Sequence, residues 1–117
     1  MTMCDTCIDV DDVGRAVKFY GEGIGLPVVR QEVDWAQLKV GDQTIWIMKT
    51  DAGLSGTISR DYQRHWTPVH LDFHVEDIDK TIERAVAAGG NMESRPKNSL
   101  ANLSDPAGNG VDLVQAS

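Results

Sequence analysis

The fold is decided by a stretch that the chain carries twice: residues 6–17 read TCIDVDDVGRAV and residues 71–82, 65 positions later, read LDFHVEDIDKTI. In both copies apolar residues alternate with other residues, which is typical of a strand with one buried face. Each copy then reaches an aspartate followed by apolar residues at helical spacing, and each helical segment runs into glycine, Gly25 and Gly90. Repetition at a fixed spacing indicates duplicated structural units. We therefore expect two matching strand–helix modules that share one core, with matching positions facing a common cavity.

Working outward from the repeat, both modules show the element order β-α-β-β-β. Module one covers about residues 1–50, a polar linker covers 51–64, and module two covers about 65–117, within a single domain. Asp12 and Asp77 are the predicted helix N-caps. The predicted strands span residues 4–11, 27–33, 35–40, 43–49, 68–76, 92–95, 100–103 and 111–115. The predicted buried helix positions are Val13, Ala16, Val17, Tyr20, Ile24, Ile78, Thr81, Ile82, Ala85 and Val86.

Length and charge exclude several classes of protein. A chain of 117 residues is long enough to bury one core without disulfide or metal staples. The net charge of −7 argues against nucleic acid or an anionic membrane as a partner, because both need a basic surface. No apolar run approaches the roughly 20 residues of a membrane span, and the N-terminal residues lack the basic and apolar segments of a signal peptide. We therefore expect a cytoplasmic protein.

Cys4 and Cys7 form a C-x-x-C pair, a spacing that also occurs in redox and zinc sites. Residues three apart on a strand point to opposite faces. A zinc site of this kind also needs a second pair of ligands, and the chain has no further cysteine. We interpret the two residues as reduced thiols.

The first strand of each module has one apolar face and one polar face. The apolar face packs on the helices and carries Thr6, Ile8, Val10, Leu71, Phe73 and Val75. The remaining face carries Asp5, Cys7, Asp9, His70, Asp72 and His74. Such a face is ordinarily exposed to solvent, and this interpretation stays open beside a functional one.

The order of elements and several short motifs resemble the vicinal oxygen chelate superfamily, which includes glyoxalase I, bleomycin-resistance proteins and extradiol dioxygenases. The motifs are VDDV at 10–13, AVKFY at 16–20, HLDF at 70–73, VED at 75–77, DPAGN at 105–109 and VDLV at 111–114. The resemblance implies an α+β fold in which two βαβββ modules form a curled, cup-shaped mixed sheet with the helices outside. The polar strand faces would then line the concave side of the cup. Because this superfamily hosts enzymes and binding proteins alike, the fold does not choose the function.

The resemblance also implies where a metal would bind. In metal-binding relatives, the four ligands come from the first residue of each module's first strand and from a carboxylate on each module's last strand. Carried over, these positions fall on Asp5, His70 and Asp112, whereas the fourth falls on Ile45 or Trp46, neither of which coordinates a metal. Asp72 and His74 are not expected to complete the set, because residues two apart on a strand are separated by roughly 6.6 Å.

The predicted ligand pocket therefore comprises Asp5, Cys7, Asp9, Trp46, His70, Asp72, His74 and Asp112. Trp35, Trp46 and Trp66 offer flat faces for stacking and for cations, although packing in the core or in a dimer is the competing interpretation. Residues 60–65 form either a rim over the pocket or a solvated linker.

Three classes of function remain open. The first, which we favour, is a glyoxalase- or bleomycin-resistance-like protein that binds a small organic molecule and needs no cofactor. The second is a lyase, isomerase or dioxygenase that uses a divalent metal ion held by Asp5, His70 and Asp112. The third is a metal-free enzyme in which a pocket carboxylate or His74 acts as the base. We also expect a homodimer, because relatives are commonly braced by a second chain and an isolated cup leaves strand edges open.

Overall fold

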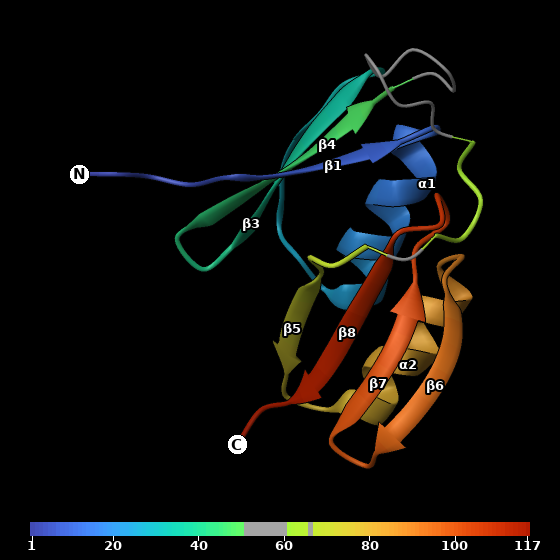
Figure 1. Ribbon diagram of the computed structural model, residues 1–117. Helices are drawn as coiled ribbons and strands as arrows, with labels where there is room; N and C mark the ends of the chain where they lie inside the picture. The colour runs from blue at the N-terminus through green and yellow to red at the C-terminus, as the bar shows by residue number, and fades with distance from the viewer. Residues whose placement is uncertain (51–60, 66) are drawn as a thin grey trace.

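The computed structural model describes residues 1–50, 61–65 and 67–117 and has the expected α+β fold of two βαβββ modules (Figure 1). Most of the predicted linker and Trp66 lie outside the described residues. The elements of module one are β1 (Thr6–Val10), α1 (Val13–Val17), the π-helix η1 (Lys18–Ile24), β2 (Val28–Gln31), β3 (Trp35–Val40) and β4 (Gln43–Lys49). The elements of module two are β5 (Leu71–Val75), α2 (Ile78–Ala87), β6 (Asn91–Lys97), β7 (Leu100–Ser104) and β8 (Gly110–Gln115). No helix among the described residues is long and apolar enough to cross a membrane.

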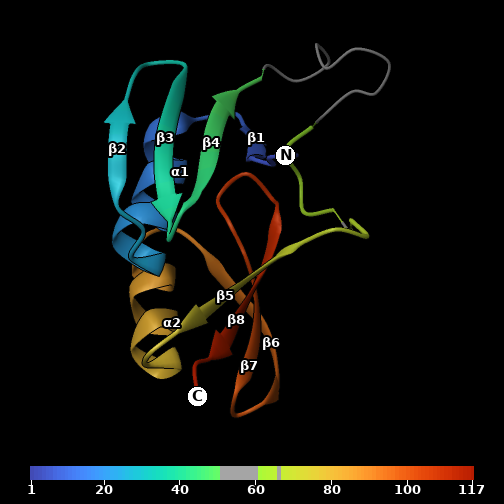
Figure 2. The ribbon, with the colours of Figure 1, turned by 90° about the vertical axis from the view of Figure 1, so that its left-hand side faces the viewer.

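The two modules have the same strand order, β1-β4-β3-β2 and β5-β8-β7-β6. In each sheet the first strand runs parallel to the last strand of the module, and the other pairs are antiparallel. The repeat read from the sequence is thus confirmed in the topology. Figure 2 shows the two sheets one above the other, with α1 and α2 stacked beside them. The curled sheet therefore consists of two four-stranded sheets, whose first strands are both edge strands.

Both helices begin at the predicted aspartates. The side chain of Asp12 accepts a hydrogen bond from the backbone N–H of Arg15, and Asp77 does the same for Lys80, so each cap satisfies a donor of the first turn. The first helix ends at Gly25, whose φ of 96° is a left-handed conformation that glycine adopts without strain.

The predicted buried stripes are mostly correct, with two differences. Val86 is 46% exposed, whereas Phe19, which the helical spacing did not include, is fully buried. Phe19 is buried because it packs against module two, where a Cβ on Gly90 would overlap its ring. The helices also approach closely at Gly23, where a Cβ would lie 2.9 Å from the Cα of Ala85. Contacts between modules, rather than the period of one helix, decide these positions.

A buried carboxylate joins the two modules. Asp105, only 1% exposed, accepts hydrogen bonds from the Tyr20 hydroxyl at 2.7 Å and from the backbone N–H groups of Ala107 and Asn109 at 2.9 Å each. The side-chain amide of Asn109 donates to Asp105 and to the backbone carbonyl of Asp9, both at 3.1 Å. Burial, together with the charge of Asp105, holds the pKa of Tyr20 well above its ordinary value. Tyr20 and Asp9 of module one are thereby tied to the loop before β8.

We expect Asp105→Ala to lower the free energy of unfolding by roughly 2–4 kcal/mol, because it leaves a buried hydroxyl and two backbone donors without their acceptor. Urea denaturation followed by circular dichroism measures this loss. The matched control is Asp79→Ala, which removes an aspartate whose side chain is 75% exposed and pairs with Arg95 at 2.9 Å. This change should cost less than about 1 kcal/mol. Equal losses in the two variants would contradict the role assigned to Asp105.

Candidate functional site

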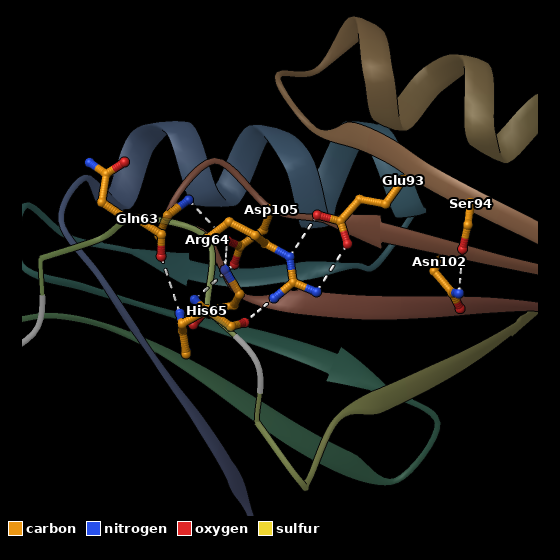
Figure 3. A network of polar contacts seen from close by, with 9 residues as sticks. Gln63, Arg64, His65, Glu93, Ser94, Asn102 and Asp105 are labelled. Carbon is orange, nitrogen blue, oxygen red and sulfur yellow. Dashed lines mark hydrogen bonds and ion pairs between the residues drawn. The ribbon is translucent and has the colours of Figure 1, made fainter.

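The sheet of module two carries a row of polar side chains on the face opposite α2. Strand register aligns Asp72 of β5 with Asp112 of β8, Asp112 with Asn102 of β7, and Asn102 with Ser94 of β6. The neighbours of Asp72 and Asp112 along the strands, such as Phe73 and Leu113, are buried in the core. The side-chain amide of Asn102 donates to the Ser94 hydroxyl at 2.6 Å (Figure 3). The row therefore spans all four strands.

The matching row of module one has different chemistry. Its members, aligned by register, are Cys7 of β1, Trp46 of β4, Gln37 of β3 and Arg30 of β2. Cys7 pairs with Trp46 as Asp72 pairs with Asp112, so Trp46 and not Ile45 occupies the place that corresponds to Asp112. The indole N–H of Trp46 donates to Asp5 at 3.2 Å. Module one thus places an aromatic ring where module two places a carboxylate.

Three ionisable groups of module two lie together at the start of β5. The Nδ1 atom of His70 is 2.9 Å from Asp72 Oδ1 and 3.4 Å from Asp112 Oδ2. Their ligand atoms all lie within 4.8 Å of one another, and Asp5 is not a member of this group. The expectation that Asp72 could not join His70 is therefore wrong. His70 lies just before β5, which begins at Leu71. The side chains of His70 and Asp72 point toward each other, so their polar atoms are much closer together than their backbones.

The environment of Asp112 makes its carboxyl harder to ionise than that of a free aspartate. Burial raises the pKa of Asp112, and hydrogen bonding to Asp72 and the charge of Asp72 raise it further, whereas His70 acts in the opposite direction. Asp112 and Asp72 are register partners on adjacent strands. Ionisation of one carboxyl therefore disfavours ionisation of the other, because the two charges have the same sign.

Two cavities meet at His70. The first, which we call the junction cavity, encloses about 280 Å³ between the free edge of β1 and module two, and its lining includes Cys7, Asp9, His70 and Asn109. The second, the sheet cavity, encloses about 250 Å³ over the polar row. Its lining includes Arg64, His70, Glu93, Ser94, Asn102 and Asp112. The segment that enters module two therefore forms one wall of each cavity.

An ion pair between Arg64 and Glu93 forms part of the lining of the sheet cavity. The Nε and Nη2 atoms of Arg64 donate to the two carboxylate oxygens of Glu93 at 2.6 and 3.0 Å, and Nη1 donates to the carbonyl of His65 (Figure 3). Hydrogen bonds from Arg64 lower the pKa of Glu93. No sequence pattern indicated this pair, because Arg64 lies in the predicted linker and Glu93 is 29 positions away.

None of the eight predicted pocket residues points into the core, since each is exposed or half-buried. The structure nevertheless distributes them over several surfaces. Cys7, Asp9 and His70 line the junction cavity, and His70 and Asp112 line the sheet cavity. His74 and Asp72 line a separate groove that includes Glu76 and Arg84. Asp5 and Trp46 line neither the junction cavity nor the sheet cavity.

The surroundings of Cys7 disfavour the thiolate form of its side chain. Burial and the neighbouring charge of Asp9 raise its pKa, which favours the neutral thiol at neutral pH. Cys4 and Cys7 are both free and exposed, in agreement with their interpretation as reduced thiols.

The face of module one opposite α1 carries an aromatic platform, formed by Trp35 and Trp46. Their ring centroids lie 6.0 Å apart with 57° between the planes, and both rings are half-buried. The guanidinium of Arg30 lies over the Trp35 ring, 5.4 Å from its centroid. Cys7, the strand neighbour of Trp46, lines the junction cavity, so the platform adjoins this cavity.

Comparison with known proteins agrees with this architecture. Residues 5–114 match the family model described as glyoxalase-like domain. The chain belongs to the glyoxalase-like family. This glyoxalase-like chain is 31% identical over 115 residues to the anthracycline biosynthesis protein DauV of Streptomyces sp. (strain C5). The match covers 90% of this chain but 38% of DauV, so the chain spans well under half the length of this relative.

Solved structures share the fold of this glyoxalase-like chain. FosX, a genomically encoded fosfomycin resistance protein from Listeria monocytogenes, superimposes with a TM-score of 0.73 at 16% identity, covering 100% of this chain and 92% of FosX. A glyoxalase/bleomycin resistance protein from Albidiferax ferrireducens T118 has a TM-score of 0.73 at 20% identity, with 98% of both chains covered. At these identities the likeness shows the fold alone.

We expect the Asp112 carboxyl to titrate at lower pH in Asp72→Asn than in the wild type, because the variant removes the charge that disfavours ionisation of Asp112. Carbon-13 NMR titration of the side-chain carboxyls measures this shift. Asp79→Asn, a change at an exposed aspartate of α2, is the control and should leave the Asp112 titration in place. An unchanged or higher titration point in Asp72→Asn would refute the coupling.

Proposed function

We propose that this glyoxalase-like chain binds a small organic molecule in the cavities that meet at His70, without a tightly held metal ion. The observation that carries the proposal is the aromatic substitution at the fourth ligand position. Trp46 occupies the place corresponding to Asp112, and it engages Asp5 through its indole N–H. Module one therefore contributes a ring and a hydrogen-bonded carboxylate where a four-ligand metal site needs two free donors.

The cavities have the composition of an organic-ligand site. Such sites combine apolar walls with a few convergent polar groups. The junction cavity provides Ile8, Leu71 and Val111 beside Asp9 and His70. The relative described as an anthracycline biosynthesis protein supports an organic molecule as the ligand of this chain as well.

A second candidate function rests on the cluster of His70, Asp72 and Asp112. One imidazole nitrogen and two carboxylates within 4.8 Å of one another form a donor set that suits a divalent ion. In this alternative, Asp72 replaces Asp5 in the ligand set, and the ion would polarise an oxygen atom of the substrate in a lyase, isomerase or dioxygenase. All three donors come from module two, so this alternative also lacks a ligand from module one.

Ligand binding after metal removal tests the proposal against this alternative. We expect chelator-treated, dialysed protein to gain thermal stability from members of a panel of small organic molecules, because its binding groups need no ion. The gain should be reduced in His70→Ala and retained in the surface control Asp79→Ala. Elemental analysis of the untreated wild type and His70→Ala should show less than one metal per chain in both. One metal per wild-type chain that survives dialysis and is lost in His70→Ala would establish the metal-dependent alternative instead.

We also propose that the chain forms a homodimer. Among the described strands, β1 is hydrogen-bonded to β4 alone and β5 to β8 alone, and such free edges readily pair with another chain. Figure 1 shows the residues before β1 running outward, away from the rest of the chain. Met1, Met3 and Val69, which flank these two edge strands in sequence, are 80% exposed or more. A second copy that covers the edges would also shield these side chains.

We expect light scattering coupled to gel filtration to give twice the chain mass of 12.8 kDa at micromolar concentration. A proline in the edge strand, introduced by Cys7→Pro, should shift the mass toward the monomer, because proline removes a backbone donor from the edge. Circular dichroism of this variant verifies that it is folded. A wild-type mass of 12.8 kDa would refute the dimer.

A further inference from the structure

We propose that the aromatic platform of Trp35 and Trp46 binds a flat aromatic cation, which stacks on the rings where the guanidinium of Arg30 now lies. This inference rests on the proposed function and names the chemical class of its ligand. It adopts the stacking interpretation of Trp35 and Trp46, which the sequence left open beside packing, and it adds Arg30 to ligand recognition.

The platform is a surface of the sheet and not part of its core. Trp35 and Trp46 lie on the face of β3 and β4 opposite α1, whereas the alternating residues Ala36 and Ile47 are fully buried in the core. Register pairs Trp35 with Met48 and Trp46 with Gln37, so the two indoles are diagonal neighbours on adjacent strands. Their half-buried rings offer apolar area to a partner without any change in the core.

The chain itself demonstrates the kind of group that this surface accepts. Arg30 places a flat, delocalised cation 5.4 Å from the centroid of Trp35, within the range of a cation–π contact. Arg30 is an exposed residue whose Nε also donates to Glu32 at 2.7 Å. Because Glu32 can retain the arginine side chain, a ligand ring can replace the guanidinium over Trp35 without leaving that charge unpaired.

Two carboxylates near the platform favour a cation over an anion once the Arg30 guanidinium is held by Glu32 instead of by the ring. The carboxylate of Asp5 accepts the indole N–H of Trp46 at 3.2 Å, so it lies at the edge of that ring. Asp9 lies in the same cross-strand row as Trp35, with Met48 between them. Asp5 thus borders the Trp46 ring, Asp9 lies in the row of Trp35 one strand further out, and the chain has a net charge of −7. An anionic aromatic ligand would be repelled by these groups.

Proflavine, a planar aromatic cation with its own fluorescence, is a suitable probe for titration of the wild-type protein. We expect Trp35→Leu to weaken proflavine binding by about tenfold, because the variant loses the stacking of the ligand on this ring. Arg30→Ala should strengthen binding by about two- to fivefold, since it removes a competing cation–π contact. Lys39→Ala is the matched control, because it removes an equal charge from β3 at a side chain bonded to Thr44. It should change the affinity by less than Arg30→Ala.

Two competitors test the selectivity. The reference competitor is 9-aminoacridine, a planar cation. Anthraquinone-2-sulfonate, a planar anion, and 1-adamantylammonium, a non-planar cation, should each displace proflavine at least tenfold less well than this reference. Equal competition by either molecule would overturn the proposal. Weaker binding in Arg30→Ala, or an equal gain in Lys39→Ala, would also overturn it. If Trp35→Leu becomes monomeric by light scattering, a second copy covers the platform, and the proposal is wrong for that reason.

The result separates this inference from the proposed function. If proflavine does not bind but other small molecules stabilise the metal-free protein in a His70-dependent manner, the inference fails and the proposed function stands. If neither proflavine nor any member of the panel binds, both fail.

Discussion

The buried carboxylate of Asp105 is the interaction on which the arrangement of the two modules depends. It accepts the hydroxyl of Tyr20 from module one and two backbone donors of its own loop. Asn109, held by the same carboxylate, reaches the backbone of Asp9 at β1. Because the loop before β8 is fixed against β1 in this way, residues of both modules come to line the junction cavity. The junction cavity therefore depends on how the two modules pack against each other as well as on the fold of each module.

Duplication supplies two equal scaffolds, and the side chains on them have diverged. Register places Trp46 and Asp112 at corresponding positions, and the residues they face across the first strand are Cys7 and Asp72. Module one consequently offers aromatic area, whereas module two offers carboxylates, an imidazole and an amide. The duplicated scaffold therefore carries two chemically distinct faces.

Several features of the site could be predicted from the sequence because they depend on local periodicity. Alternation along the first strands distinguished the residues that face the core from those that do not. As it predicted, Cys7, Asp9 and His70 lie outside the core. The association of Asp72 with His70 could not be predicted, because side-chain direction at the end of a strand is not set by backbone rise. The Arg64–Glu93 ion pair could not be predicted from the sequence either, since Arg64 lies in a connecting segment and Glu93 lies on a strand 29 positions away.

The sequence by itself determined the two modules, the helix caps and the strand faces, because these follow from spacing between residues that are near one another in the chain. Only the tertiary structure decided that Phe19 is buried against Gly90, that Trp46 and not Ile45 corresponds to Asp112, and that the expected single pocket is divided at His70. The physical reason is that these features depend on register and docking. A shift of one residue or a small change in the packing of two modules alters which side chains meet, while the local pattern stays the same.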